Sequence, residues 1–239
     1  MAFASWKLAA LLLAAFAAAC SPAAPEGETP PNAADAAVAD DAAGAAPQAL
    51  APDAKLVVAF GDSLFAGYRL GRGEGFAPAL ERRLAAAGLK TSVFNAAVSG
   101  DTTQGARQRL AFTLDGLPRK PDLVIVGVGG NDMLRGLGPE QTRANLEAIL
   151  TELRTRDIPA MLTGMLAAPN LGAEYAAAFN PIYPQLAAQF DVPLYPFFLE
   201  GVIGQRGLML PDGIHPNGEG VDAIASRVAP LVTRAIPAS

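Results

Sequence analysis

Short apolar runs that alternate with longer stretches of helical character are the feature that most constrains this fold. Uninterrupted apolar runs are typical of strands in a parallel sheet that helices cover on both faces. Strands that alternate with helices predict an α/β domain with a mostly parallel sheet between two helical layers. The apolar runs cover residues 56–60, 92–94, 123–128, 160–163 and 192–195, and the helical stretches lie near residues 75–87, 103–115, 139–156, 172–189 and 217–235.

Polar, glycine-rich segments follow three of the expected strands. Residues 61–63 come after the first strand, residues 95–101 after the second and residues 129–132 after the third. Ligands of an open parallel sheet bind beyond the carboxyl ends of its strands. The sequence therefore predicts a functional site at this edge of the sheet.

Ser63 and His215 are the residues from which nucleophilic catalysis could be built. A serine after a strand also serves as a helix N-cap, and a single histidine is often structural. His215 is the only histidine in the chain, and Asp212 precedes it by three residues in a loop punctuated by glycine and proline. This spacing lets the carboxylate reach the imidazole and fix its tautomer. The pattern favours a serine hydroxyl that is activated by a neighbouring base.

Four separated segments resemble the characteristic blocks of the SGNH (GDSL) hydrolase family. They are Gly61-Asp62-Ser63-Leu64, Gly100 within residues 98–101, Asn131 within residues 129–132, and Asp212 with His215. The resemblance extends over nearly all of residues 55–235. It implies a three-layer, flavodoxin-like domain with a mostly parallel five-stranded sheet. It also implies hydrolysis of acyl esters and thioesters through an acyl-enzyme, without a metal or organic cofactor.

The resemblance assigns a role to each matching residue. It makes Ser63 the nucleophile, His215 its base and Asp212 the carboxylate that orients the imidazole. The backbone N–H groups of Ser63 and Gly100 and the side-chain amide of Asn131 would form the oxyanion hole. Substrate contacts are expected from Ile214 and from a loop that resembles the family's mobile substrate loop, namely Pro169, Asn170 and Leu171.

The expected substrates are small-molecule or lipid esters and thioesters: medium or long acyl chains, lysophospholipids and aryl esters. An alternative within the same family is a carbohydrate O-deacetylase that acts on envelope polysaccharide. An alternative of another class is a catalytically silent, envelope-binding lipoprotein. Such a protein should lack a member of the catalytic set, whereas Ser63, Asn131, Asp212 and His215 are all present.

The N-terminal segment is typical of a bacterial export signal. Lys7 precedes an apolar run over residues 8–19, which is shorter than the about 20 residues needed to span a bilayer. Residues 17–19 resemble a lipobox, which predicts that Cys20 is acylated, and Ser21 after it is compatible with sorting to the outer membrane. Cleavage by an ordinary signal peptidase, with Cys20 as a free thiol, is the alternative. We expect an exported, periplasmic protein that is anchored to the outer membrane through Cys20.

Residues 21–53 have the composition of a flexible tether. They hold six acidic residues, no basic residue and no aromatic residue, and little that could be buried in a core. The chain is thus expected to comprise an export signal (1–20), a disordered acidic tether (21–53) and a hydrolase domain (54–239).

Charge and ligand counts exclude other classes of function. Residues 54–239 hold 17 basic and 17 acidic residues, so the domain lacks the positive surface that nucleic-acid binding requires. One cysteine and one histidine do not make a zinc site. We therefore expect no nucleic-acid partner and no structural zinc. Composition does not exclude a Mg or Ca site made of carboxylates, but the sequence has no acidic loop of the calcium-binding pattern, so we expect no metal. We also expect a monomer.

Overall fold

A single parallel sheet forms the centre of the protein. The computed structural model describes residue 51 and residues 53–237. The strands of the sheet are β1 (Lys55–Gly61), β2 (Thr91–Asn95), β3 (Leu123–Gly127), β4 (Ala160–Thr163) and β5 (Leu194–Tyr195). They lie in the order β2-β1-β3-β4-β5, and all neighbouring pairs are parallel. This order confirms the predicted flavodoxin-like fold.

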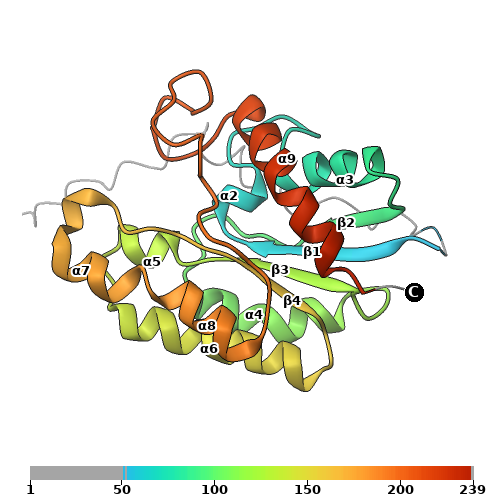
Figure 1. Cartoon of the computed structure of the whole chain (residues 1–239), viewed down its shortest axis with the longest axis horizontal. Helices are drawn as coiled ribbons and strands as arrows, with labels where there is room; N and C mark the ends of the chain where they lie inside the picture. The colour runs from blue at the N-terminus through green and yellow to red at the C-terminus, as the bar shows by residue number, and fades with distance from the viewer. Residues whose placement is uncertain (1–50, 52, 238–239) are drawn as a thin grey trace, which may run out of the picture.

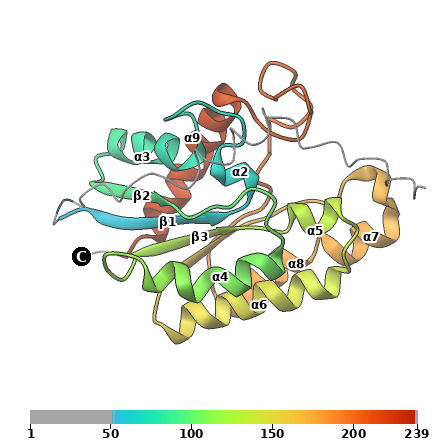
Figure 2. The ribbon, with the colours of Figure 1, turned by 180° about the vertical axis from the view of Figure 1, so that it is seen from behind.

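Helices cover both faces of the sheet. They are α2 (Ser63–Ala66), α3 (Phe76–Ala86), α4 (Thr103–Asp115), α5 (Gly130–Leu134), α6 (Pro139–Thr155), α7 (Gly172–Phe179), α8 (Ile182–Phe190) and α9 (Gly218–Ala235), with a 3-10 turn η1 (Pro169–Leu171). Figure 1 shows α3 and α9 on one face and α4, α6 and α8 on the other. The view from behind shows the same division (Figure 2). The three-layer arrangement predicted from the alternating pattern is confirmed.

The two central strands carry the most deeply buried side chains. Residues 57–60 of β1 and residues 123–126 of β3 are fully inaccessible to solvent. Ala59 pairs with Asn95 on one side and with Ile125 on the other, so β1 is hydrogen-bonded along both edges. Burial of one such Val, Ile, Leu or Phe side chain contributes about 1.5–3 kcal/mol. These two apolar runs form the central strands because a central position in a sheet covered on both faces buries every residue of the run.

The helices α4 and α9 begin with side-chain caps. The Thr102 hydroxyl accepts the Gly105 N–H at 3.3 Å at the start of α4. The Asn217 side chain accepts the Gly220 N–H at 2.9 Å at the start of α9. Such caps satisfy N–H groups that have no partner within the helix. The two caps follow directly on residues 98–101 and closely on residues 212–215, the segments in which the sequence predicts site residues.

Several element boundaries differ from the sequence prediction, three of them for a clear physical reason. The helix expected over residues 172–189 is divided into α7 and α8, because Pro181 lacks the N–H that a continuous helix would use. The fifth strand is only two residues long, since Pro193 cannot donate to a ladder. The third strand ends at Gly127 rather than at residue 128, before Gly129 turns away with φ +120°. The short helices α2 and α5 were not expected.

Most of the N-terminal predictions fall outside the described residues. These include the export signal over residues 1–20, the acylation of Cys20 and nearly all of the tether over residues 21–53. The domain start at residue 54 stays a prediction, and β1 begins next to it at Lys55. Over residues 51 and 53–237, no helix combines the length and the apolar character that crossing a membrane requires.

Candidate active site

A tight turn between β1 and α2 places Ser63 at the carboxyl edge of the sheet. Asp62 caps α2, and its side chain accepts the Leu64 N–H at 3.1 Å. Gly61 has no room for a side chain, because a Cβ there would lie 2.6 Å from the Phe65 ring. The chain therefore enters the helix at once, with Ser63 as its first residue and its side chain only partly buried.

Ser63, His215 and Asp212 form a continuous chain of hydrogen bonds. The Ser63 Oγ lies 2.8 Å from His215 Nε2, and His215 Nδ1 lies 2.8 Å from Asp212 Oδ2. The carboxylate can only accept, so Nδ1 carries the proton and Nε2 is free to accept from the serine hydroxyl. The ring of Tyr68 packs against the imidazole, with 4.4 Å between ring centroids.

The Asp212 carboxylate also holds the loop that carries the histidine. Its Oδ1 accepts the N–H groups of Ile214 at 2.9 Å and of His215 at 3.0 Å. The Leu210 N–H donates to the His215 carbonyl at 2.8 Å and closes the loop. Partial burial acts to raise the pKa of Asp212, but these N–H groups and the imidazole outweigh it and hold the pKa below its usual value. Asp212 thus stays ionised well into the acidic range.

Gly100 and Asn131 approach Ser63 from two further strand ends. Gly100 has φ +83°, a left-handed conformation that favours glycine. The Asn131 Nδ2 donates to the Asp101 carbonyl at 2.9 Å, which fixes the orientation of the amide. An amide nitrogen has two hydrogens, so Asn131 keeps one for another acceptor. The structure brings Ser63, Gly100, Asn131 and His215 to the wall of one cleft.

The cleft is large and mostly apolar. Its volume is about 640 Å³. Of the four residues expected to contact substrate, Pro169 and Ile214 line it, whereas Asn170 and Leu171 are not on its wall. Sequence reasoning missed most of the apolar lining, which includes Tyr68, Met133, Leu134, Met165, Leu166, Phe197, Leu199 and Ile203.

A weak sequence signal for part of this lining existed. Met165 and Leu166 follow the end of β4 by two and three residues, so the rule that ligands bind beyond strand ends applies to them as well. Leu134, Leu166, Ile203 and Ile214 are each 41–53% exposed at the cleft. Exposed aliphatic side chains that gather around one cavity indicate an apolar ligand.

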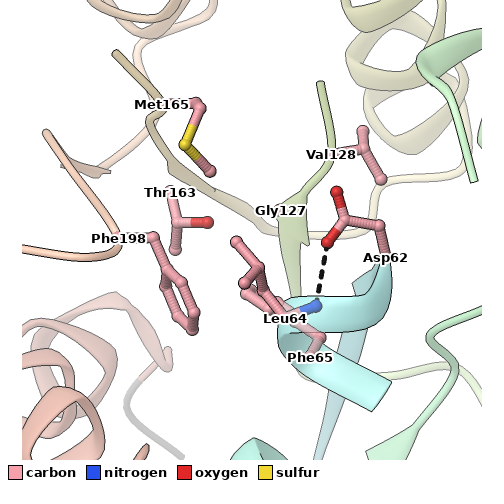
Figure 3. A pocket seen from close by; sticks show the side chains of 8 residues that line it. All are labelled: Asp62, Leu64, Phe65, Gly127, Val128, Thr163, Met165 and Phe198. Carbon is pink, nitrogen blue, oxygen red and sulfur yellow. Dashed lines mark hydrogen bonds between the residues drawn. The ribbon is translucent and has the colours of Figure 1, made fainter. Parts of the chain in front are cut away.

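Asp62, the residue before the serine, is a buried acid. Its side chain is 2% exposed and borders a small internal cavity of about 10 Å³. Figure 3 shows Asp62 on one side of this cavity and Thr163, Met165 and Phe198 on the other. Burial raises the pKa of Asp62 to about 7; the Leu64 N–H opposes this rise, and the charges of Asp101 and Asp132 add to it.

Asp132, in contrast, is buried with a full set of donors. Its carboxylate accepts the Thr103 N–H at 2.8 Å, the Thr103 hydroxyl at 2.5 Å and the Thr142 hydroxyl at 3.3 Å. These bonds tie the start of α5, where Asn131 lies, to α4 and α6. The aspartates next to Ser63 and Asn131 therefore hold the loops of the site.

A serine hydrogen-bonded to an imidazole that is oriented by a carboxylate, at the strand-end edge of a doubly wound sheet, defines the class of serine hydrolases. The chain belongs to the GDSL-like lipase/acylhydrolase family, whose sequence model matches residues 59–223. The resemblance drawn from the sequence motifs is confirmed. The protein is accordingly a hydrolase that acts on ester bonds.

Named relatives and solved structures are similar over most of the chain. Esterase TesA of Pseudomonas aeruginosa is 41% identical over 163 residues, which are 68% of this chain and 80% of the relative. Thioesterase 1/protease 1/lysophospholipase L1 of Escherichia coli K12 is 40% identical over 189 residues, or 77% and 88% of the two chains. The crystal structure of AlinE4, an SGNH-hydrolase family esterase, superposes with a TM-score of 0.67 at 48% identity and covers 79% of this chain and all of that one.

The raised pKa of Asp62 predicts a pH-dependent stability. The unfolded chain ionises near the ordinary value of 3.8, whereas the folded protein keeps the proton up to about pH 7. Stability should therefore decrease as the pH rises from about 4 to 7, by on the order of 4 kcal/mol at most. In Asp62→Asn, which can still cap α2, this part of the decrease should vanish, and the variant should be the more stable protein at pH 8.

Denaturant unfolding of both proteins between pH 4 and 8 measures this effect. Asp191→Asn, an exposed substitution at the end of α8, is the matched control. Its free energy of unfolding should change with pH as that of the wild type does. If the free energy of unfolding of Asp62→Asn decreases with pH as steeply as that of the wild type, the buried acid is not the source of the pH dependence.

Proposed function

We propose that the protein hydrolyses acyl esters and thioesters through an acyl-enzyme on Ser63. The observation that carries the proposal is the chain of two 2.8 Å hydrogen bonds from Ser63 through His215 to Asp212, which opens into an apolar cleft. A serine hydroxyl is a poor nucleophile until a base accepts its proton, and the imidazole is in place to do so.

Each step of the proposed reaction uses a group of this chain. The Ser63 Oγ attacks the carbonyl carbon while its proton moves to His215 Nε2, and Asp212 stabilises the resulting imidazolium. When the tetrahedral intermediate collapses, the bond to the alcohol or thiol breaks and His215 returns the proton to the leaving group. A water molecule then attacks the acyl-enzyme with His215 again as base, which releases the carboxylic acid and restores Ser63.

The negative charge of the tetrahedral intermediate requires donors that are already aimed at it. The backbone N–H groups of Ser63 and Gly100 and the free hydrogen of the Asn131 amide are our candidates. Ser63 is the first residue of α2, so its N–H has no carbonyl partner within the helix. Gly100 exposes its backbone to the cleft without a side chain in between. Thus all three candidates border the same space.

The shape and lining of the cleft favour substrates with medium or long acyl chains. Lysophospholipids and aryl esters belong to this proposed class. Its walls are aliphatic, aromatic and thioether side chains, and its volume of about 640 Å³ suits a chain of many methylene groups. The names of the relatives, which include an esterase, a thioesterase/lysophospholipase and an arylesterase, agree with this class. An acetylated sugar would instead require many hydrogen-bonding groups, so the carbohydrate deacetylase is the weaker candidate.

We further propose that the chain is exported and tethered. The charged and apolar N-terminal run, the lipobox-like residues 17–19 and the acidic composition of residues 21–53 support acylation of Cys20 and a linker that separates the domain from the membrane. This places the enzyme in the periplasm, attached to the outer membrane. The hydrolase domain would then begin at residue 54.

Loss of the serine or of its base should abolish turnover but not folding. Ser63→Ala and His215→Ala should each lower kcat by at least about 10³-fold, because Ser63 is the serine bonded to the imidazole and His215 is the only histidine in the chain. The melting curves should stay close to that of the wild type. Ser63→Ala with a tenth of wild-type turnover would place the nucleophile elsewhere.

Substrate preference should follow the apolar wall. The wild type should hydrolyse p-nitrophenyl octanoate with a higher kcat/KM than p-nitrophenyl acetate, and should show little activity toward acetylated sugars. Leu166→Asp, at the exposed part of the cleft, should reduce kcat/KM for the octanoate by about 10-fold and hardly change it for the acetate. Phe112→Asp on α4, which is 84% exposed and away from the cleft, should change neither value. A preference for acetylated sugars in the wild type would favour the deacetylase instead.

Acylation can be tested on the full-length chain. Expressed in a bacterium that processes lipoproteins, the protein should be found in the membrane fraction and should incorporate a fatty-acid probe. Cys20→Ser should abolish both properties and leave esterase activity intact, because the cysteine lies 43 positions before Ser63 in the sequence. Recovery of unmodified wild type in the soluble periplasmic fraction would show that residues 17–19 are an ordinary cleavage site.

A further inference from the structure

Arg109 joins three separate segments at the edge of the sheet. Its Nε donates to the Asp101 carboxylate at 2.5 Å, its Nη1 to the Ala96 carbonyl at 2.6 Å and its Nη2 to the Gly61 carbonyl at 3.0 Å. Gly61 ends β1, Ala96 follows β2, and Asp101 follows the glycine expected in the oxyanion hole. One side chain on α4 thus connects the loops that carry different parts of the proposed site.

The guanidinium is held rigidly in this position. It lies over the buried Phe60 ring at 4.2 Å from the ring centroid. The side chains of Arg109 and Asp101 are only 20% and 14% exposed, so their ion pair is largely shielded from water. The planar fork of an arginine fixes the directions of its hydrogen bonds, which a lysine would not do. The contacts therefore define a geometry and do more than neutralise a charge.

Two of the three partners of Arg109, Gly61 and Asp101, lie within two residues of a proposed oxyanion donor. Gly61 precedes Ser63 by two residues, and its carbonyl also accepts the Val98 N–H at 3.1 Å. Asp101 directly follows Gly100. The Asp101 carbonyl accepts a hydrogen bond from Asn131 Nδ2 at 2.9 Å. Asp101 thus orients the amide of Asn131 through its backbone, while Arg109 holds its carboxylate. The backbone N–H of Ser63, that of Gly100 and the Asn131 amide are linked through this one guanidinium.

We propose that Arg109 is a positioning residue that holds the three oxyanion donors in register. It is not among the residues that line the cleft, so it acts through its partners and not on the substrate. The inference rests on the proposed acyl-enzyme function of Ser63. Donors stabilise the transition state only when they are fixed where the charge develops, so a small loss of register reduces turnover. Acyl-chain binding depends on the distant apolar walls and should not change.

The test compares Arg109→Met with Arg156→Met. Methionine keeps an apolar stem against Phe60 but makes none of the three hydrogen bonds. Arg156 is a matched control, because its guanidinium also holds two carboxylates, Asp115 at 2.5 Å and Glu152 at 2.7 Å, and it does not line the cleft. Asp101→Ala is a second variant, which removes the carboxylate and keeps the backbone carbonyl that Asn131 uses. Activity is measured with p-nitrophenyl octanoate below the melting temperature of each variant.

Arg109→Met should lower kcat by about 10-fold or more and change KM by no more than about twofold, the signature of an interaction made in the transition state. Asp101→Ala should show the same split, Arg109→Lys should restore part of kcat, and Arg156→Met should keep both constants. The effects of Arg109→Met and Asn131→Ala on kcat should be less than additive, because the Asn131 amide is one of the donors that Arg109 positions. A merely structural role would lower the melting temperature without this coupling.

The wild type separates failure of this inference from failure of the proposed function. If the wild type neither turns over the ester nor reacts with a fluorophosphonate at Ser63, the proposed function is wrong. If the wild type does both and a folded Arg109→Met keeps kcat within about threefold, only the positioning role is wrong. If Arg109→Met does not fold, Asp101→Ala decides: a wild-type kcat in that variant overturns the inference, and a reduced kcat with unchanged KM supports it.

Discussion

The abrupt turn from β1 into α2 is the constraint on which the rest of the structure depends. The Phe65 ring packs against the backbone of Gly61 and Gly127 at the ends of β1 and β3, where neither position has room for a side chain. Phe76 and Phe198 hold this ring from the other side, with centroids 4.6 Å and 4.9 Å away. The ring fits there only because both positions are glycine. Phe65 can therefore belong to a helix that starts directly at the strand end, with Ser63 as its first residue facing the cleft. The reactive end of the site is therefore supported by close packing.

Three buried or half-buried carboxylates near Ser63 are stabilised in three different ways. Asp101 is paired with Arg109, Asp132 accepts from the threonines of α4 and α6, and Asp62 has one N–H donor and a raised pKa. The negative charges of Asp101 and Asp132 contribute to the raised pKa of Asp62. The loops that carry Gly100 and Asn131 are tied down by the same groups, so the folding stability of this edge and the geometry of the site are coupled.

The fold was predictable because its information is local. The apolar run over residues 123–128 can only be buried on both faces, and capping residues such as Asn217 mark the start of a helix. The division between α7 and α8 was missed because the apolar period continues across Pro181, although a proline in a helix is itself a warning. The positions of Ser63, Gly100, Asn131 and His215 in one cleft agree with the rule that parallel strands end at a common edge.

The rest of the site has no local signature. Phe197, Leu199 and Ile203 come from the irregular segment after β5, and only the tertiary fold brings them into the same cleft as Met133 and Leu166. Arg109 looks like an ordinary solvated residue of α4, because its three partners lie 8, 13 and 48 positions away in the sequence. A pattern of spacing therefore points to the proposed catalytic groups, whereas the walls and the supports of the site are properties of the folded chain.

The covalent intermediate provides the most direct test of the central claim. The protein is mixed with p-nitrophenyl octanoate, quenched in acid during turnover and examined by mass spectrometry of the intact chain and of its peptides. The account predicts a burst of p-nitrophenol with a single octanoyl adduct on the peptide that contains Ser63, and no adduct on any other peptide. Turnover of the ester without an adduct under conditions where deacylation is slow, or an adduct on another residue, would contradict it.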